Sequence, residues 1–313
     1  MSRKTFSKTR GRRAARCLPS APATTAGFSR GSAGADHVAA AADRTSRADW
    51  PPGRVLVVAA TFQERENILP LIDAVLAVDP KLQMLVVDDD SPDGTGELAL
   101  ARAAVEPRLH VLIRGGRRGL GSAILEGLQL AATRGFAAGV NIDADFSHDP
   151  RDIPRLLAAL EPLGGRPADV VIGSRRVPGG RSVGWPLSRH IASRLVCWFA
   201  RWLLWIPARD ASSGFRAVRL EVLRRLPAHC SSGYAFHEEL LLAALAGEDD
   251  RAGQGERPGR IMEVPITFTN RAHGRSKARP KAVATAAIDL LRLSWRRISG
   301  GSGSGMGFSH RIF

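Results

Sequence analysis

Two aspartates separated by a single residue, Asp143 and Asp145, are the strongest indication of chemistry in this chain, and they follow a short apolar run. In an extended segment, residues i and i+2 face the same way, so both carboxylates can offer oxygens to one Mg²⁺ or Mn²⁺ ion that also binds a diphosphate. The motif therefore predicts a divalent-metal site and phosphate chemistry. Taken alone, it also fits an Asp-rich turn that binds no metal.

A second acidic cluster, at residues 88–90, also follows an apolar run and leads into the sequence Ser-Pro-Asp-Gly-Thr. By itself that sequence is typical of a type I turn followed by a helix cap. Ligands of open α/β sheets bind beyond the carboxyl ends of the strands. Because both acidic clusters follow strand-like runs, we expect them to share one cleft.

The elements that must position these clusters are predicted from apolar runs typical of strands, at residues 55–59, 84–87, 110–113, 138–142 and 170–172. Helical patterns lie between the early runs, notably at 67–78 and 122–133. This alternation predicts an α/β fold with a mostly parallel sheet. After residue 175 it gives way to a long helical stretch, a Ser-Ser-Gly-Phe-Arg loop, a helix at 234–246 and a strand at 261–268.

The composition divides the 313 residues into a folded middle and two atypical ends, and its hydrophobic content of 44% supports one sizeable core or two modest ones. Residues 1–52 are predicted to be a disordered basic extension, because the first fifty residues hold ten Lys or Arg against three Asp. A targeting peptide is an alternative, but a flexible basic arm or an upstream start codon is favoured. We expect one folded domain at 53–298 and a flexible Gly/Ser-rich tail at 299–313.

Charge and cysteine patterns restrict the partners and the compartment. The net charge of +15 favours an anionic partner such as a lipid headgroup or a phosphorylated substrate. Arg outnumbers Lys forty to five, a ratio that GC-rich coding alone can produce, and there is no zinc-finger or RNA-binding signature. We therefore expect no nucleic-acid partner. Three widely spaced cysteines form neither a disulfide framework nor a metal-ligand pattern, which fits a reducing cytoplasm.

The most apolar segment, residues 190–206, contains three of the six tryptophans. It is shorter than a membrane span, it carries Arg194 and Arg201, and Pro207 ends it. Because His190 and the two arginines fall four and seven residues apart, they form a polar stripe on an otherwise apolar helix. Two interpretations carry equal weight: a helix lying in a membrane interface, or a helix packed on the sheet. Either way, we expect any membrane attachment to be peripheral.

The order of the motifs along the chain resembles known enzymes. Segments 59–67, 88–95, 118–123 and 143–145 resemble the nucleotide-sugar half of family 2 glycosyltransferases with the GT-A fold. Five later motifs, at 173–175, 184–189, 212–216, 263–266 and 271–277, resemble those of dolichol-phosphate (polyprenol-phosphate) mannose synthases. The resemblance covers residues 54–298. It implies a Rossmann-like, mixed and mostly parallel sheet flanked by helices, with amphipathic helices at a membrane interface.

The resemblance also implies an activity. We expect an inverting glycosyltransferase that moves mannose from GDP-mannose to a polyprenyl phosphate, peripherally bound at the cytoplasmic face of the membrane, with Mg²⁺ or Mn²⁺ as cofactor. The acceptor phosphate is already anionic at neutral pH, so no general base is required. One alternative is a transferase that uses UDP-glucose or another sugar nucleotide, and a second is a non-catalytic protein that binds nucleotide sugars.

Site residues follow from the same resemblance. Donor binding is expected at Ala60, Thr61, Phe62, Glu64, Val87, Asp89, Asp143, Ala144, Arg271 and Lys277. The metal is expected at Asp143, Asp145 and Ser147, and the acceptor phosphate at Arg175, Arg189 and Ser193. Asp145, Arg175 and Arg189 are the expected catalytic groups. The chain departs from the usual family pattern at Ala60, Phe62, Gln63 and Asp90. By the resemblance, these positions lie at the pocket for the nucleotide base, so they bear on the preference for guanine.

Several nearby polar residues receive structural predictions instead. We expect Asp88 and Asp90 to shape their turn, and His148 to be solvated or to cap a helix. The run His237-Glu238-Glu239 lacks a second histidine four residues on, so it does not fit a zinc-protease pattern. We expect these three residues to be structural.

Overall fold

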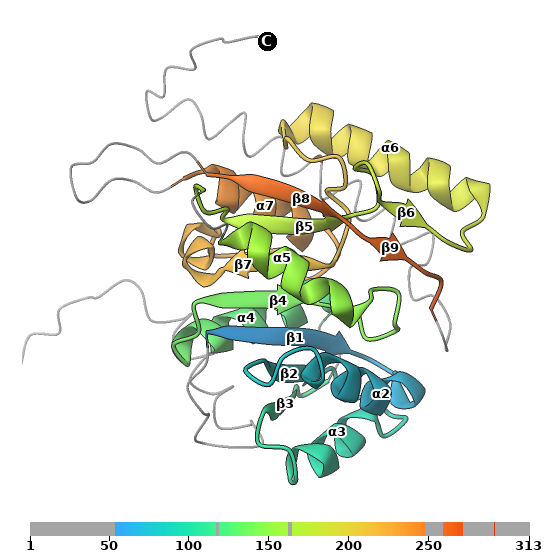
Figure 1. Ribbon diagram of the computed structural model, residues 1–313, viewed down its shortest axis with the longest axis vertical. Coiled ribbons are helices and arrows are strands. Elements are labelled where there is room, and N and C mark those ends of the chain that lie inside the picture. The colour runs from blue at the N-terminus through green and yellow to red at the C-terminus, as the bar shows by residue number, and fades with distance from the viewer. Residues whose placement is uncertain (1–53, 117–118, 162–164, 248–258, 272–290, 292–313) are drawn as a thin grey trace, which may run out of the picture.

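The structure, a computed structural model, describes residues 54–116, 119–161, 165–247, 259–271 and 291 (Figure 1). The predicted basic extension and the predicted C-terminal tail lie outside the described residues, as does the predicted donor-binding residue Lys277.

A seven-stranded sheet in the order β3-β2-β1-β4-β7-β5-β8 forms the centre of the domain. Its strands are β1 (Val55–Thr61), β2 (Gln83–Asp88), β3 (Leu109–Ile113), β4 (Ala138–Asn141), β5 (Val170–Ser174), β7 (Arg216–Arg219) and β8 (Ile261–Pro265). All neighbours pair in parallel except β7, which runs antiparallel to both β4 and β5. The predicted mixed, mostly parallel sheet is confirmed, and the five strands predicted before residue 175 are present.

Helices cover both faces of this sheet (Figure 1). They are α2 (Arg65–Leu76), α3 (Thr95–Ala103), α4 (Leu120–Thr133), α5 (Ile153–Leu160), α6 (Leu187–Leu204) and α7 (Phe236–Leu245), with 3₁₀ turns η1 (Pro150–Asp152) and η2 (Leu220–Arg225). Because successive strand residues face opposite ways, Leu56 and Val58 pack with α4, α6 and α7, whereas Val57 and Ala59 pack with α2, α3 and α5. Two hydrophobic layers therefore hold one sheet.

The segment predicted as one strand at 261–268 is two strands in two sheets. After Pro265, β9 (Thr267–Phe268) pairs in parallel with β6 (Arg181–Ser182), away from the main sheet. Strand β7 is a second difference, because the Ser-Ser-Gly-Phe-Arg sequence was expected to be a loop and its last residue opens β7. A four-residue strand that pairs with distant strands carries little local signal.

Helix α6 has two different faces. Cys197, Ala200 and Leu204 are buried in the hydrophobic core. Apolar side chains on the other side are exposed, namely Leu187, Ile191, Leu195, Trp198, Trp202 and the adjoining Trp205. Packing on the domain is therefore confirmed for one face, and the membrane interpretation stays a prediction for the other. In the part of the chain that the structure describes, no helix is long and apolar enough to cross a membrane.

Candidate functional site

Most predicted site residues lie at the ends of β1, β2, β4 and β5 or in the loops that follow them, and these parallel strands end at the same edge of the sheet. Arg189 and Ser193 lie on α6, and Arg271 follows β9. Four described residues that are not glycine adopt positive φ: Gln63 (57°), Asp90 (58°) and Phe146 (59°) in the loops after β1, β2 and β4, and Trp205 (53°) at the end of α6. Left-handed backbone at such residues is uncommon and concentrates at functional sites. Both loops that carry the acidic clusters therefore contain one of these residues, as does the loop after β1.

Asp88 organises the turn between β2 and α3. Its carboxylate accepts hydrogen bonds from the Thr61 hydroxyl (2.7 Å), the Ser91 backbone N–H (2.8 Å) and the Ser91 hydroxyl (2.7 Å). The prediction that Asp88 shapes the turn is confirmed. It also means that the hydroxyl of Thr61, a predicted donor-binding residue, bonds to the neighbouring strand's turn.

Glu64 and Asp89, the two buried acids among the predicted donor-binding residues, are held by hydrogen bonds or ion pairs. The Glu64 carboxylate accepts a hydrogen bond from the Asn67 side-chain amide at 2.8 Å. Asp89 lies 2.8 Å from a guanidinium nitrogen of Arg114 and accepts the Gly119 backbone N–H at 3.0 Å. Arg114 is itself 1% exposed and lies 3.1 Å from the Glu126 carboxylate. Asp89 is thus oriented by a buried arginine that the sequence did not single out.

The apolar members of the predicted donor site divide into two kinds. Val87 and Ala144 are buried within the two hydrophobic clusters, so a ligand at the strand ends would meet their backbone. Ala60 and Phe62 are only partly buried and keep accessible surface.

Asp143 and Asp145 stand close together after β4, as their spacing predicts. Asp145 accepts the Ser147 backbone N–H at 3.0 Å, and its other oxygen lies 3.1 Å from a guanidinium nitrogen of Arg271. About a third (34%) of the Asp143 side chain is exposed. Desolvation by the surrounding protein and the negative charge of Asp145 nevertheless raise the pKa of Asp143, although the charges of His148, Arg175 and Arg271 act to lower it. A cation would relieve the repulsion between two carboxylates so placed.

The donor set fits a hard divalent ion that is shared with a substrate. Among the described residues, no group of three or more His, Cys, Asp or Glu side chains forms a metal site. Asp143 and Asp145 would therefore be the acidic ligands, and diphosphate or water oxygens would complete the shell. Ser147 is buried beside Asp145.

His148 was predicted to be solvated or to cap a helix, and both predictions are wrong. Its ring is 1% exposed, stacks on Phe215 at 5.0 Å and meets the edge of Phe268 at 5.2 Å. Nδ1 accepts the Asp143 backbone N–H at 3.3 Å, and burial lowers the pKa of the ring. The loop after β4 turns inward at this point, so His148 supports the aspartate loop from within.

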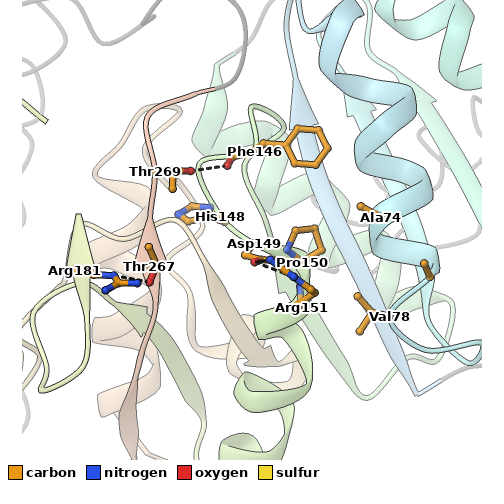
Figure 2. Close-up of a pocket in the computed structure, with 11 residues that line it drawn as sticks. Ala74, Val78, Phe146, His148, Asp149, Pro150, Arg151, Arg181, Thr267 and Thr269 are labelled. Atoms are coloured by element: carbon orange, nitrogen blue, oxygen red, sulfur yellow. Dashed lines mark hydrogen bonds and ion pairs between the residues drawn. The ribbon is translucent and has the colours of Figure 1, made fainter. Parts of the chain in front are cut away.

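A cavity of about 820 Å³ lies behind the aspartate loop, between α2 and the β6–β9 pair (Figure 2). Phe146 and His148 line it, but Asp143 and Asp145 do not. Its arginines are engaged locally, because Arg151 pairs with Asp149 at 2.6 Å and Arg181 donates to the Thr267 hydroxyl at 3.2 Å. This cavity is distinct from the predicted cleft at the strand ends.

Arg175, predicted to bind the acceptor phosphate, forms a buried bidentate pair with Asp210. The guanidinium–carboxylate distances are 2.6 and 2.7 Å, and the Arg175 backbone N–H also donates to Asp210 at 2.9 Å. Although burial lowers the pKa of Arg175, Asp210 raises it above its ordinary value. The guanidinium carbon also lies 5.1 Å from the centre of the Trp185 ring. The guanidinium of Arg175 is therefore held in one orientation.

The two other predicted acceptor residues gather around the same cluster. The guanidinium of Arg189 lies 4.1 Å from the centre of the Trp185 ring, and burial, Arg271 and Arg175 lower its pKa. The Ser193 hydroxyl accepts a hydrogen bond from Arg176 at 2.7 Å, and Arg176 lies 3.6 Å from Asp210. The structure thus brings Arg175, Arg189 and Ser193 together, through partners that the sequence analysis missed.

Some of these partners left a trace in the sequence. A single alanine separates Asp210 from the Ser-Ser-Gly-Phe-Arg motif, and Arg176 directly follows Arg175. Tyr234, the only tyrosine in the chain, faces the charges of Asp143, Asp145, Arg271 and Arg189. Its loop is closely packed, because a Cβ on Gly121 would lie 2.4 Å from the Gly233 carbonyl oxygen. The sequence did offer a signal for Tyr234, because it is the only tyrosine in the chain and it lies two residues before the start of α7.

The run from His237 to Glu239 is buried, as expected of structural residues. Arg216 donates to the His237 carbonyl, and Glu239 accepts the Ser231 backbone N–H at 2.7 Å. Burial raises the pKa of Glu238 to about 7, against the opposing charge of Arg216.

Comparisons with known proteins agree with this arrangement. The sequence pattern of glycosyl transferase family 2 matches residues 56–226. An undecaprenyl-phosphate mannosyltransferase of Micrococcus luteus is 40% identical over 241 residues, covering 76% of this chain and 93% of that protein. A polyprenol monophosphomannose synthase of Mycolicibacterium smegmatis is 40% identical over 230 residues, covering 72% and 82%.

A solved structure extends the likeness to the fold. Glucosyl-3-phosphoglycerate synthase from Mycobacterium tuberculosis, in complex with Mn²⁺, UDP and glucosyl-3-phosphoglycerate, has a TM-score of 0.54 at 22% identity, covering 91% of each chain. At this identity the match supports the architecture alone.

Proposed function

Because the chain belongs to glycosyl transferase family 2, we propose that it transfers mannose from GDP-mannose to a polyprenyl phosphate, giving polyprenyl-phosphate mannose. The observation that carries this proposal is the 40% identity to two proteins named for that reaction class, over most of their lengths. The site adds chemical support, since a pair of carboxylates and a group of arginines lie at one edge of the sheet.

The reaction requires no proton transfer to start. An acceptor phosphate oxygen, anionic at neutral pH, forms a bond to C1 of mannose while the bond from C1 to the diphosphate oxygen breaks, and GDP leaves with the electron pair. A single displacement of this kind inverts the configuration at C1. The task of the protein is therefore to bring two anions together and to stabilise the leaving diphosphate.

On the donor side, we assign the nucleoside to Glu64 and Asp89, with Ala60, Thr61 and Phe62 beside it. The bonds from Asn67 and Arg114 hold the two carboxylates in fixed directions, so they are preorganised for the hydrogen-bond donors of a base or ribose. The backbone of Val87 and Ala144 would complete the wall.

Asp143 and Asp145 would hold a Mg²⁺ or Mn²⁺ ion, with Ser147 beside them. When bound, the ion neutralises charge that develops on the leaving diphosphate. Arg271 contacts Asp145. Once a cation binds that carboxylate, the Arg271 guanidinium would be released to contact the donor diphosphate. Lys277, assigned to the same task, lies outside the described residues.

On the acceptor side, we assign the phosphate to Arg175, Arg189 and Ser193. Guanidinium forks match phosphate oxygens in geometry and charge. Trp185 orients the Arg189 guanidinium by stacking, and the pair with Asp210 orients Arg175.

We also assign the exposed face of α6 to a membrane surface that carries anionic lipid. Its six apolar side chains repeat every three or four residues, so they lie along one side of the helix. The exposed Arg194 and Arg201 flank that side and complement anionic headgroups. Such a face would place the acceptor arginines, near the same helix, beside a lipid-borne phosphate.

The activity is tested by incubating the purified protein with Mg²⁺, a short polyprenyl phosphate and radiolabelled GDP-mannose or UDP-glucose. We expect label in the organic phase from GDP-mannose only. Asp145→Asn should abolish it, whereas Asp149→Asn, a carboxylate on the same loop that faces Arg151, should not. Label from UDP-glucose alone would overturn the donor assignment, and no label from either would overturn the transferase assignment.

The membrane assignment is tested by co-sedimentation with vesicles that contain phosphatidylglycerol. We expect the double variant Trp198→Ser, Trp202→Ser to bind vesicles at least about tenfold more weakly than the wild type, because two large apolar side chains leave the interface. Val105→Ser removes an exposed apolar side chain elsewhere and serves as the control. Equal binding by the double variant would refute the assignment.

A further inference from the structure

One buried carboxylate serves two guanidinium groups beside β5. Asp210 is fully buried, contacts Arg175 at 2.6 Å and lies 3.6 Å from Arg176. Arg189, which stacks on Trp185, forms no ion pair with a carboxylate of the described residues. These four residues, Arg175, Arg176, Arg189 and Asp210, form the acceptor cluster. The cluster contains three guanidinium groups and one carboxylate. The surplus is two positive charges.

Further charged and neutral groups surround the acceptor cluster. Glu263 accepts the backbone N–H groups of Arg209 and Asp210. The Cys197 thiol, 3.8 Å from Asp210, has a pKa raised by burial and stays neutral. Arg216 faces Glu238 and donates to backbone carbonyls. On the donor side, Asp143 acts on Arg175 and Asp145 acts on Arg189, and Arg271 pairs with Asp145.

Partly buried charges without partners are costly, so the acceptor cluster should bind best the ligand whose charge cancels the surplus. A phosphate monoester carries a charge of about −1.5 to −2 at pH 7. The transfer turns this monoester into a diester with one ionisable oxygen, while the second negative charge leaves with the diphosphate. The phosphate group of the substrate therefore carries one more negative charge than that of the product. The acceptor cluster, with a surplus of two positive charges, is matched to the substrate.

We propose that Arg176 makes the acceptor site selective for charge, so that the site holds a dianionic phosphate monoester and releases the monoanionic diester product. This inference rests on the proposed function, because it takes the acceptor cluster as the acceptor-phosphate site. Arg176 sets the surplus: without its charge, Arg175 and Asp210 form a neutral pair and only Arg189 remains. It also donates to the Ser193 hydroxyl, which orients that hydroxyl for the ligand.

The experiment compares the dissociation constants of two ligands with the same short isoprenoid chain, the phosphate monoester and its mannosyl phosphodiester, in detergent at pH 8. For the wild type we expect the monoester to bind about tenfold or more tightly than the diester, since one additional charge pair forms close to the guanidinium groups. Arg176→Met should lose most of this ratio, and Arg176→Lys should keep most of it. Arg209→Met, which removes an exposed arginine next to Asp210 in sequence, should behave like the wild type.

Arg176→Gln provides a second neutral variant, and circular dichroism establishes that each variant is folded. A wild-type ratio near one would overturn the proposal, as would an unchanged ratio in both neutral variants or an equal loss in Arg209→Met. Because the readout is binding, it is independent of turnover. Charge selectivity without mannose transfer would refute the proposed function and leave this inference standing, whereas transfer without selectivity would do the reverse.

Discussion

The donor and acceptor sides of the site both contain a buried Arg–Asp contact, but with opposite stoichiometry. On the donor side, one guanidinium, that of Arg114, contacts two carboxylates, Asp89 and Glu126. On the acceptor side, one carboxylate, Asp210, contacts two guanidiniums, Arg175 and Arg176. In the proposed function, the same kind of buried pair would present carboxylates to the hydrogen-bond donors of a nucleoside in one half, and positive charge to a phosphate in the other.

The largest effect is expected from Arg114→Met, which removes the donor-side guanidinium. Loss of a buried charge partner typically costs about 3–5 kcal/mol. We expect urea unfolding to show a loss of that order, and GDP-mannose binding to weaken while monoester binding persists. Arg102→Met removes a more exposed arginine paired with Asp73 and should cost less than about 1 kcal/mol. Equal losses in the two variants would contradict the buried role of Arg114.

A somewhat smaller loss, about 2–4 kcal/mol, is expected from Asp210→Asn, because the asparagine can still accept one hydrogen bond from Arg175. The prediction that separates the two halves is that donor binding survives in this variant and acceptor binding changes. Asp73→Asn is the exposed control. Calorimetric titration with GDP in Mg²⁺ checks the donor side, and a weakening as large as that in Arg114→Met would abolish the distinction between the halves.

A pH-dependent effect separates Asp210 from its buried neighbour Glu238. Burial raises the pKa of both groups, but the bonds and charge of Arg175 bring that of Asp210 below its ordinary value, whereas that of Glu238 is raised to about 7. A raised carboxyl pKa adds stability below the ordinary value of 4.5, and this stability is lost as pH rises through 7.

We therefore expect Glu238→Gln to gain about 3 kcal/mol of unfolding free energy relative to the wild type between pH 4 and pH 8. Denaturant unfolding at a series of pH values measures it. Glu97→Gln, at an exposed position, should run parallel to the wild type. A parallel curve for Glu238→Gln as well would mean that Arg216 keeps Glu238 ionised in the folded protein.

The smallest effect concerns the point where the two halves meet. A Cβ on Gly214 would lie 3.0 Å from an Asp143 carboxylate oxygen, so Gly214→Ala should shift that oxygen by a few tenths of an ångström. We expect Mn²⁺ to bind about three- to tenfold more weakly, as is usual when the support of a ligand is disturbed. Gly233→Ala, where the nearest atom is 3.7 Å away, should leave Mn²⁺ affinity unchanged in a fluorescence titration.

The donor half was largely predictable because its signals are local. Asp143 and Asp145 lie close together in space because only one residue separates them in sequence. The apolar runs that precede the acidic clusters are buried strands that pair in parallel, as predicted. Even there, His148 was misjudged. Its burial depends on Phe215 and Phe268, which come from distant segments.

The acceptor half depends on contacts that no window of sequence contains. Arg175 and Asp210 are separated by 35 positions, and Arg176 contacts Ser193 only because α6 lies next to the loop that follows β5. Arg175 was predicted to bind the acceptor phosphate, but the carboxylate that orients it, Asp210, was not predicted. Strand β7 was missed for the same reason, since its pairing partners β4 and β5 precede it by dozens of residues.

The position of β7 also determines the order in which the sheet can be completed during synthesis. Strands β1 to β4 pair with one another and need no later residue, whereas β5 pairs only with β7 and β8 among the described strands. When the ribosome has released residues up to 141, the donor half can already form its ladder, while β5 must wait until residues 216–219 emerge. A nascent chain of this protein should therefore form the edge proposed to bind the nucleotide first and the cluster proposed to bind the acceptor phosphate last.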